Sequence, residues 1–143
     1  MKRPEKIFSL FAVGLVCLAI FNSGKRWNIP LYDTMALLEV WQVLIVLAGV
    51  LVLFAGIYWG ASRFNLLLIP VITHIHVFVT IWESMFIGLA WIVAFPGGIP
   101  KPSIDLLQII SHSISYVWFP AQVLFVFNLI LGIVRKLRNR IPQ

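Results

Sequence analysis

The chain has 143 residues, of which 61% are hydrophobic and only 11% charged, and its mean hydropathy is +0.98. Soluble domains are nearer half apolar and a quarter charged, so this composition excludes a soluble globular protein and predicts an integral membrane protein. The net charge of +6 comes from Lys and Arg at the edges of apolar stretches. That placement indicates membrane topology and anionic lipid headgroups, and it argues against nucleic acid as a partner.

Four apolar stretches predict an all-α, four-helix membrane bundle that forms one domain over residues 1–143. The predicted spans cover about residues 7–22, 40–59, 66–95 and 106–134. The first follows a basic start, as in a secretory signal peptide, but no small-x-small cleavage site follows it, so we expect an uncleaved helix. Between the first two spans, Leu31–Leu38 is predicted to form an interfacial turn or a short helix.

The second span carries Gly49, Gly56 and Gly60 on one side of the predicted helix, including a G-x-x-x-G spacing. Small residues on one face let a neighbouring helix approach closely. We expect this face to pack against another helix of the same protomer, with a dimerisation face as the alternative.

The third span combines an apolar composition with several polar side chains. On a helix, Thr73, His76, Thr80 and Glu83 fall on one stripe, whereas His74 points the other way. Ionisable groups at membrane depth are costly and need a partner. Pro70 lies in the first turns of the predicted span, where a bend is expected.

The fourth span has a polar stripe of its own and a proline, Pro120, at which we expect a kink. The stripe consists of Asp105, Gln108, His112, Ser115 and Tyr116. A short loop joins the third and fourth spans, so they should be antiparallel neighbours with facing stripes. At about 1.5 Å of rise per residue, Glu83 lies about 18 Å from the outer end of the third span, which places it nearest Tyr116. By the same count, His76 should be level with the end of the fourth span.

Four residues are therefore candidates for cofactor binding: Glu83, His112, Tyr116 and His76. The cofactor stays unknown; a quinone, or a haem or other pigment with one histidine ligand, would suit these groups. Haem held by two histidines is disfavoured, because the helical rise puts His76 and His112 about 20 Å apart in depth. In the other interpretation these groups are structural. Glu83 is then protonated, or it forms a hydrogen bond across the seam, which is the contact between the third and fourth spans. No catalytic or metal-binding set is predicted, since His74 and His76 diverge.

Charge placement predicts the orientation. Eight of the eleven Lys and Arg residues fall on the side that carries both termini, and three fall on the other side. By the positive-inside rule, both termini are expected in the cytoplasm of a multi-pass protein of the inner (cytoplasmic) membrane.

Two segments stand out beside the spans: Phe21-Asn22-Ser23-Gly24-Lys25 after the first span and Leu66-Leu67-Leu68-Ile69-Pro70-Val71-Ile72 at the start of the third. In these segments and in its four spans, the chain resembles the DoxX-like family of small four-helix bacterial membrane proteins. The spacing from Pro70 to the histidines and the position of Glu39 relative to Gly49 depart from the family pattern. The resemblance implies a link to quinone-coupled redox complexes and assigns no catalytic residue.

The leading functional hypothesis is an accessory or structural subunit of a larger membrane complex, in contact with lipid and with other membrane subunits. The resemblance implies that this complex takes part in quinone-linked electron transfer. The first alternative is a self-contained membrane protein that binds a quinone, a haem or a pigment. The second is a small transporter or proton channel.

Overall fold

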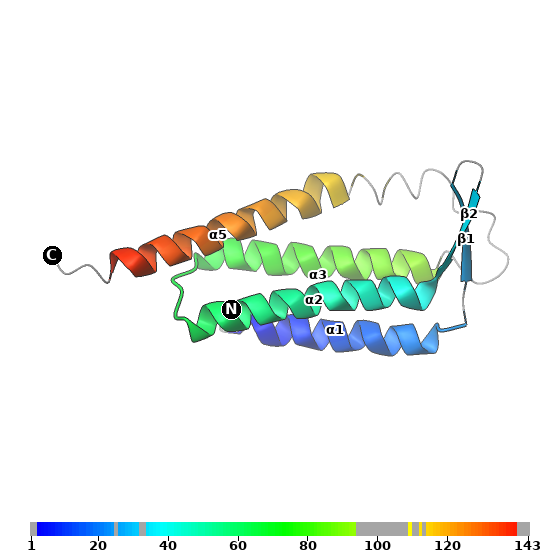
Figure 1. Cartoon of the computed structure of the whole chain (residues 1–143), viewed down its shortest axis with the longest axis horizontal. Helices are drawn as coiled ribbons and strands as arrows, with labels where there is room; N and C mark the ends of the chain where they lie inside the picture. The colour runs from blue at the N-terminus through cyan, green and yellow to red at the C-terminus, as the bar shows by residue number, and fades with distance from the viewer. Residues whose placement is uncertain are drawn as a thin grey trace.

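The computed structural model describes residues 3–24, 26–31, 34–93, 109, 112 and 114–139. Side chains are not described for residues 26–31, 34–38, 91, 93, 114 and 115. In chain order the elements are α1 (Pro4–Phe21), β1 (Arg26–Leu31), β2 (Thr34–Glu39), α2 (Val40–Arg63), α3 (Pro70–Val93), the π-helical segment η1 (Ile114–Trp118) and α5 (Phe119–Arg138) (Figure 1).

Four of the described helical segments are long and apolar enough to cross a membrane. They are α1, α2, α3 and the continuous helix formed by the end of η1 and α5. The prediction of four spans is confirmed in number and composition. Their outward faces are apolar, as at Leu10, Val46 and Phe78, and suit contact with lipid.

The connection between α1 and α2 corrects the predicted fold. Instead of an interfacial turn or short helix over Leu31–Leu38, β1 and β2 pair as an antiparallel hairpin, with Arg26 opposite Glu39 and Leu31 opposite Thr34. The all-α class holds for the four spans, and this connection adds a two-stranded hairpin to them. The apolar residues here alternate too little to signal a strand by period two, so the sequence pattern did not indicate the hairpin.

The start of α3 differs from the predicted boundary. α3 begins at Pro70, four residues after the predicted start, because proline restricts the preceding residue and suits the first helical position. The bend expected at Pro70 is therefore wrong. Pro120 lies in the first turn of α5, directly after η1. Its ring would collide with the carbonyl four residues earlier, and the wider π turn accommodates it.

α3 is the central helix of the bundle. It contacts α1, α2 and α5, while α1 and α2 pair along their lengths (Figure 1). A capping box at Glu39 and Gln42 starts α2, and the Trp41 indole N–H donates to the Glu39 carboxylate. The apolar core between α1 and α2 includes Phe8 and Leu51, both fully buried.

The start of α1 and the end of α5 lie at the same end of the bundle (Figure 1). There, Lys136 near the end of α5 donates a hydrogen bond to the Phe64 carbonyl after α2, and its ammonium lies 5.8 Å from the Phe64 ring centroid. Pro4 of α1 and Ala61 of α2 line one pocket at this end. The chain runs along the bundle an even number of times, so the first helix starts and the last helix ends at the same end.

The three glycines of α2 do not lie at a helix contact in the described part of the chain. A Cβ built at Gly49, Gly56 or Gly60 meets no atom within 4 Å. The expected packing of this face within the protomer is therefore not seen there. The close approaches are made by Gly88, next to Leu44 and Leu15, and by Gly132, next to the segment that follows α2.

Gly132→Leu is expected to destabilise the protein by about 1–3 kcal/mol, the usual cost of overpacking a tight contact. A Cβ there would lie 2.9 Å from Leu68 Cδ2, and the Leu67 backbone carbon at 3.7 Å limits the escape of a larger side chain. Reversible unfolding in mixed detergent micelles measures the effect. The matched control is Gly56→Leu, which enters open space; equal losses of stability in the two variants would contradict the contact.

Candidate functional site

The polar stripe predicted on α3 is buried as a unit. Thr73, His76, Thr80 and Glu83 are all at most 7% exposed, whereas His74 is exposed and its Nδ1 lies 2.7 Å from the Pro70 carbonyl. Because α3 lies in the centre of the bundle, this stripe faces protein rather than lipid. The prediction that these four residues lie on one face of the helix, and that His74 points away from that face, is confirmed.

His76 is the centre of the site and contacts all three other helices. Its ring stacks on Phe125 of α5 at 4.2 Å between centroids, with an interplanar angle of 13°. Phe54 of α2 meets it edge-on at 4.8 Å, and Phe8 of α1 and Tyr58 of α2 complete the aromatic cage. The ring is 1% exposed.

Both ring nitrogens of His76 have partners. The Tyr58 hydroxyl lies 3.0 Å from Nδ1, and Gln122 Oε1 of α5 lies 2.8 Å from Nε2. The Gln122 amide nitrogen donates to Thr80 Oγ1 at 3.1 Å, which fixes the orientation of the amide. An amide oxygen only accepts, so in the neutral ring Nε2 carries the proton and Nδ1 accepts from Tyr58.

A second polar connection ties α5 to the start of α3. The Asn128 side chain is fully buried, and its Oδ1 accepts from the Ile69 backbone N–H at 2.7 Å. Its amide nitrogen lies within hydrogen-bond distance of the Ile69 carbonyl (3.3 Å) and of Thr73 Oγ1 (3.2 Å). Asn128 therefore satisfies backbone groups at the point where Pro70 interrupts the chain's regular hydrogen bonding.

These bonds confirm that α3 and α5 are antiparallel neighbours, and they correct the depth of His76. His76 lies opposite Gln122 and Phe125, early in α5, and not at the level of the end of the fourth span. The predicted span ended at residue 134, but the helix continues to Arg138, so its end lies further along the bundle than the apolar run suggested.

The other candidate residues divide into two groups. Glu83 is 3% exposed on the same stripe as His76, and the adjacent Ser84 donates to the Thr80 carbonyl of its own helix at 2.7 Å. His112 is exposed, Tyr116 is 74% exposed, and their rings stack on each other at 5.7 Å. The Tyr116 side chain is thus outside the buried seam. Asp105, Gln108 and the Ser115 side chain lie outside the described residues.

Three members of the site were not predicted from the sequence: Tyr58, Gln122 and Asn128. Gln122 and Asn128 are isolated amides in an otherwise apolar stretch, and Tyr58 places a phenol inside the second span. The rule applied to Glu83, that a polar group inside a span needs a partner, would have selected all three.

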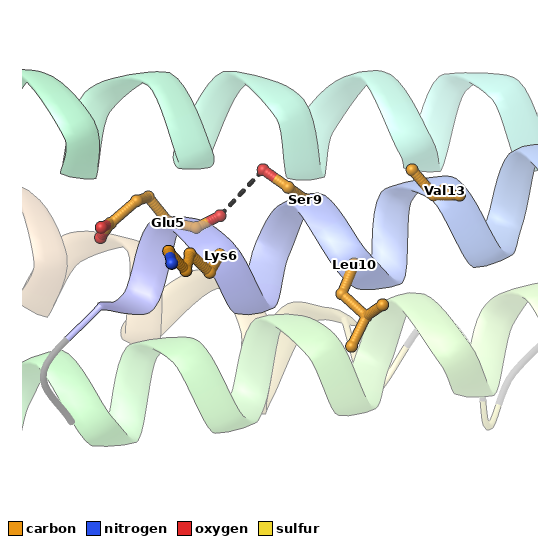
Figure 2. Close-up of a pocket in the computed structure, with 5 residues that line it drawn as sticks. All are labelled: Glu5, Lys6, Ser9, Leu10 and Val13. Atoms are coloured by element: carbon orange, nitrogen blue, oxygen red, sulfur yellow. Dashed lines mark hydrogen bonds between the residues drawn. The ribbon is translucent and has the colours of Figure 1, made fainter.

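One pocket lies near the seam, and another lies on the surface of α1. One, of about 230 Å³, is at the shared end of the helices, and its lining includes Glu5, Tyr58, Ser62, Thr73 and His74. The other, of about 360 Å³, is lined by residues of α1 alone, where Ser9 donates to the Glu5 carbonyl (Figure 2). Only the first adjoins the His76 network.

Comparison with known proteins adds no relative: no family model, no curated protein and no solved structure matches the chain.

Proposed function

We propose that the chain is a membrane-embedded accessory or structural subunit of a larger membrane complex. The observation that supports this proposal is that the polar groups of the seam pair with one another across helices. His76 joins Tyr58 and Gln122, and Asn128 joins α5 to the start of α3. Groups that satisfy one another in this way hold helices in register, which suits a structural role.

The glycine face of α2 supports contact with another subunit. Gly49 and Gly56 are exposed and adjoin open space, so a second helix can approach the α2 backbone closely there. The resemblance to the DoxX-like family is the basis for proposing that the complex is of the quinone-linked electron-transfer kind.

We further propose the inner-membrane orientation with both termini in the cytoplasm. Six described cations lie at one end of the bundle, which would then face the cytoplasm, whereas Arg26 follows α1 at the other end. They are Arg3, Lys6, Arg63, Arg135, Lys136 and Arg138.

A self-contained cofactor site at Glu83, His112 and Tyr116 has less support. Tyr116 is largely exposed and pairs with His112 instead of facing Glu83. Haem ligation by His76 would require one of its ring nitrogens to leave Tyr58 or Gln122. The buried residues present therefore suit hydrogen bonding between helices better than axial ligation.

The test is purification of the tagged chain from its own membranes in mild detergent. We expect a heteromeric complex with fixed subunit ratios that persists through two chromatographic steps. Gly56→Leu should dissociate the chain from it, because the new side chain fills the space open to a partner helix. A fully functional monomer or homo-oligomer would overturn the proposal.

Gly14→Leu is the matched control. Gly14 on α1 is also exposed and has nothing within 4 Å of its Cβ position. It should leave both the complex and the stability of the isolated chain unchanged. Dissociation by both variants would show that bulk on any outer face is sufficient, and would remove the support that the α2 face gives.

A further inference from the structure

The pocket at the shared end of the helices is large enough to hold water. Its volume of about 230 Å³ far exceeds the roughly 10–15 Å³ that a single water needs. Ser62, Thr73 and Glu5 in its lining supply polar groups for such water. Tyr58 also lines this pocket, although it is only 2% exposed.

Tyr58 connects the pocket to His76. Its hydroxyl is 3.0 Å from Nδ1, the nitrogen that accepts in the neutral ring, while Nε2–H is held by Gln122 Oε1. Phe8, Phe54 and Phe125 surround the rest of the ring. Of the two hydrogen-bond partners of His76, Tyr58 is the one in the lining of this pocket, so its hydroxyl links the pocket to the imidazole.

We propose that His76 is a proton-binding site, loaded from the water of the pocket through the Tyr58 hydroxyl. In the step, a hydronium in the pocket transfers a proton to the Tyr58 oxygen while the original Tyr58 proton moves to Nδ1. One O–H bond of the hydronium and the original O–H bond of the tyrosine break, while a new tyrosine O–H bond and an N–H bond of the imidazole form. The net change is one proton passed from hydronium to the ring, which leaves water in the pocket and Tyr58 neutral.

The network accommodates both states. In the imidazolium, Nε2–H still donates to Gln122 and Nδ1–H donates to the Tyr58 oxygen, whose own proton turns to the pocket. Phe125, stacked at 4.2 Å, presents a π face to the cation. Apart from the added proton, the two states therefore differ in the direction of the Tyr58 hydroxyl.

The groups that face His76 from each packed element are few. α1 contributes Phe8, α2 contributes Phe54 and Tyr58, and α5 contributes Phe125 and Gln122. Along α3, Thr73 and Thr80 lie about one turn away, and Glu83 about two turns away on the same stripe. Of these, Tyr58 and Glu83 are the titratable groups, and Tyr58 touches the ring directly.

The test is a pH titration of the full chain in nanodiscs, followed by nitrogen NMR of labelled histidine. The chain has three histidines, so His74→Gln with His112→Gln leaves His76 as the sole signal. We expect a bare Nδ1 and a protonated Nε2 at high pH, and conversion of Nδ1 to the protonated form on acidification. An unchanged ring across the pH range in which the fold persists would overturn the proposal, as would a ring protonated at Nδ1 alone.

Tyr58→Phe in the same background tests the route. We expect loss of the transition over that pH range, because both the relay and the acceptor for Nδ1–H are gone. Trp59→Phe, an exposed neighbour on α2, is the control and should keep the transition. A transition that survives in Tyr58→Phe would overturn the route. If that variant does not fold, the titration of the sole-histidine protein alone decides whether His76 binds a proton.

Discussion

His76→Ala is expected to destabilise the bundle by about 3–5 kcal/mol, the range found when a large buried ring is truncated. The substitution leaves a cavity among the rings of the aromatic cage. It also removes the partner of the Tyr58 hydroxyl and of Gln122 Oε1, which adds the cost of unpaired buried polar groups. Reversible unfolding of the purified chain in mixed micelles, followed by circular dichroism, measures the loss.

His74→Ala is the internal control for that experiment. His74 is exposed and adjoins a carbonyl of its own helix, so its replacement should change the free energy of unfolding by less than about 0.5 kcal/mol. Similar losses in the two variants would show that the cage around His76 does not hold the helices together.

Asn128→Leu is expected to lower stability by about 2 kcal/mol. Each hydrogen bond between membrane helices contributes about 0.6 kcal/mol on average, with maxima near 1.7, and an unsatisfied buried donor costs about 1–3 kcal/mol. Leucine has the same number of side-chain heavy atoms as asparagine, although it is bulkier, and it leaves the Ile69 N–H without its acceptor. The same unfolding measurement applies.

A double-mutant cycle with Thr73→Val separates this effect from general repacking. Thr73 Oγ1 lies 3.2 Å from the Asn128 amide nitrogen, so the two residues share an interaction. Their combined loss should therefore be smaller than the sum of the single losses by about 0.5 kcal/mol or more. Strict additivity would contradict the bond.

The sequence predicted the number of spans, the antiparallel contact of α3 and α5, and the buried stripe. Hydropathy and helical period determine these features, and both can be read locally. The stripe at Thr73, His76, Thr80 and Glu83 follows from helix geometry alone, and burial agrees with it.

The partners of that stripe were harder to predict, because they depend on helix rotation and length. Counting residues from the ends of apolar runs placed Glu83 nearest Tyr116, and α3 does contact η1, but the Tyr116 side chain is exposed. Thr80 and Thr73 of the stripe bond to Gln122 and Asn128, respectively. Glycine spacing failed for a similar reason. The same G-x-x-x-G pattern fits an inner or an outer face, and here it adjoins open space.

The long sequence separation of the seam has a consequence for membrane insertion. Thr73 and His76 leave the ribosome 46–55 residues before Asn128 and Gln122, their partners on α5. At translation rates of roughly 5–20 residues per second, α3 waits about 2–11 s for these groups. During that interval its polar stripe needs shelter from lipid, which α2 provides in part through Tyr58. We therefore expect the insertion machinery to retain α3 until the last helix arrives, and truncation before α5 to mark the chain for degradation.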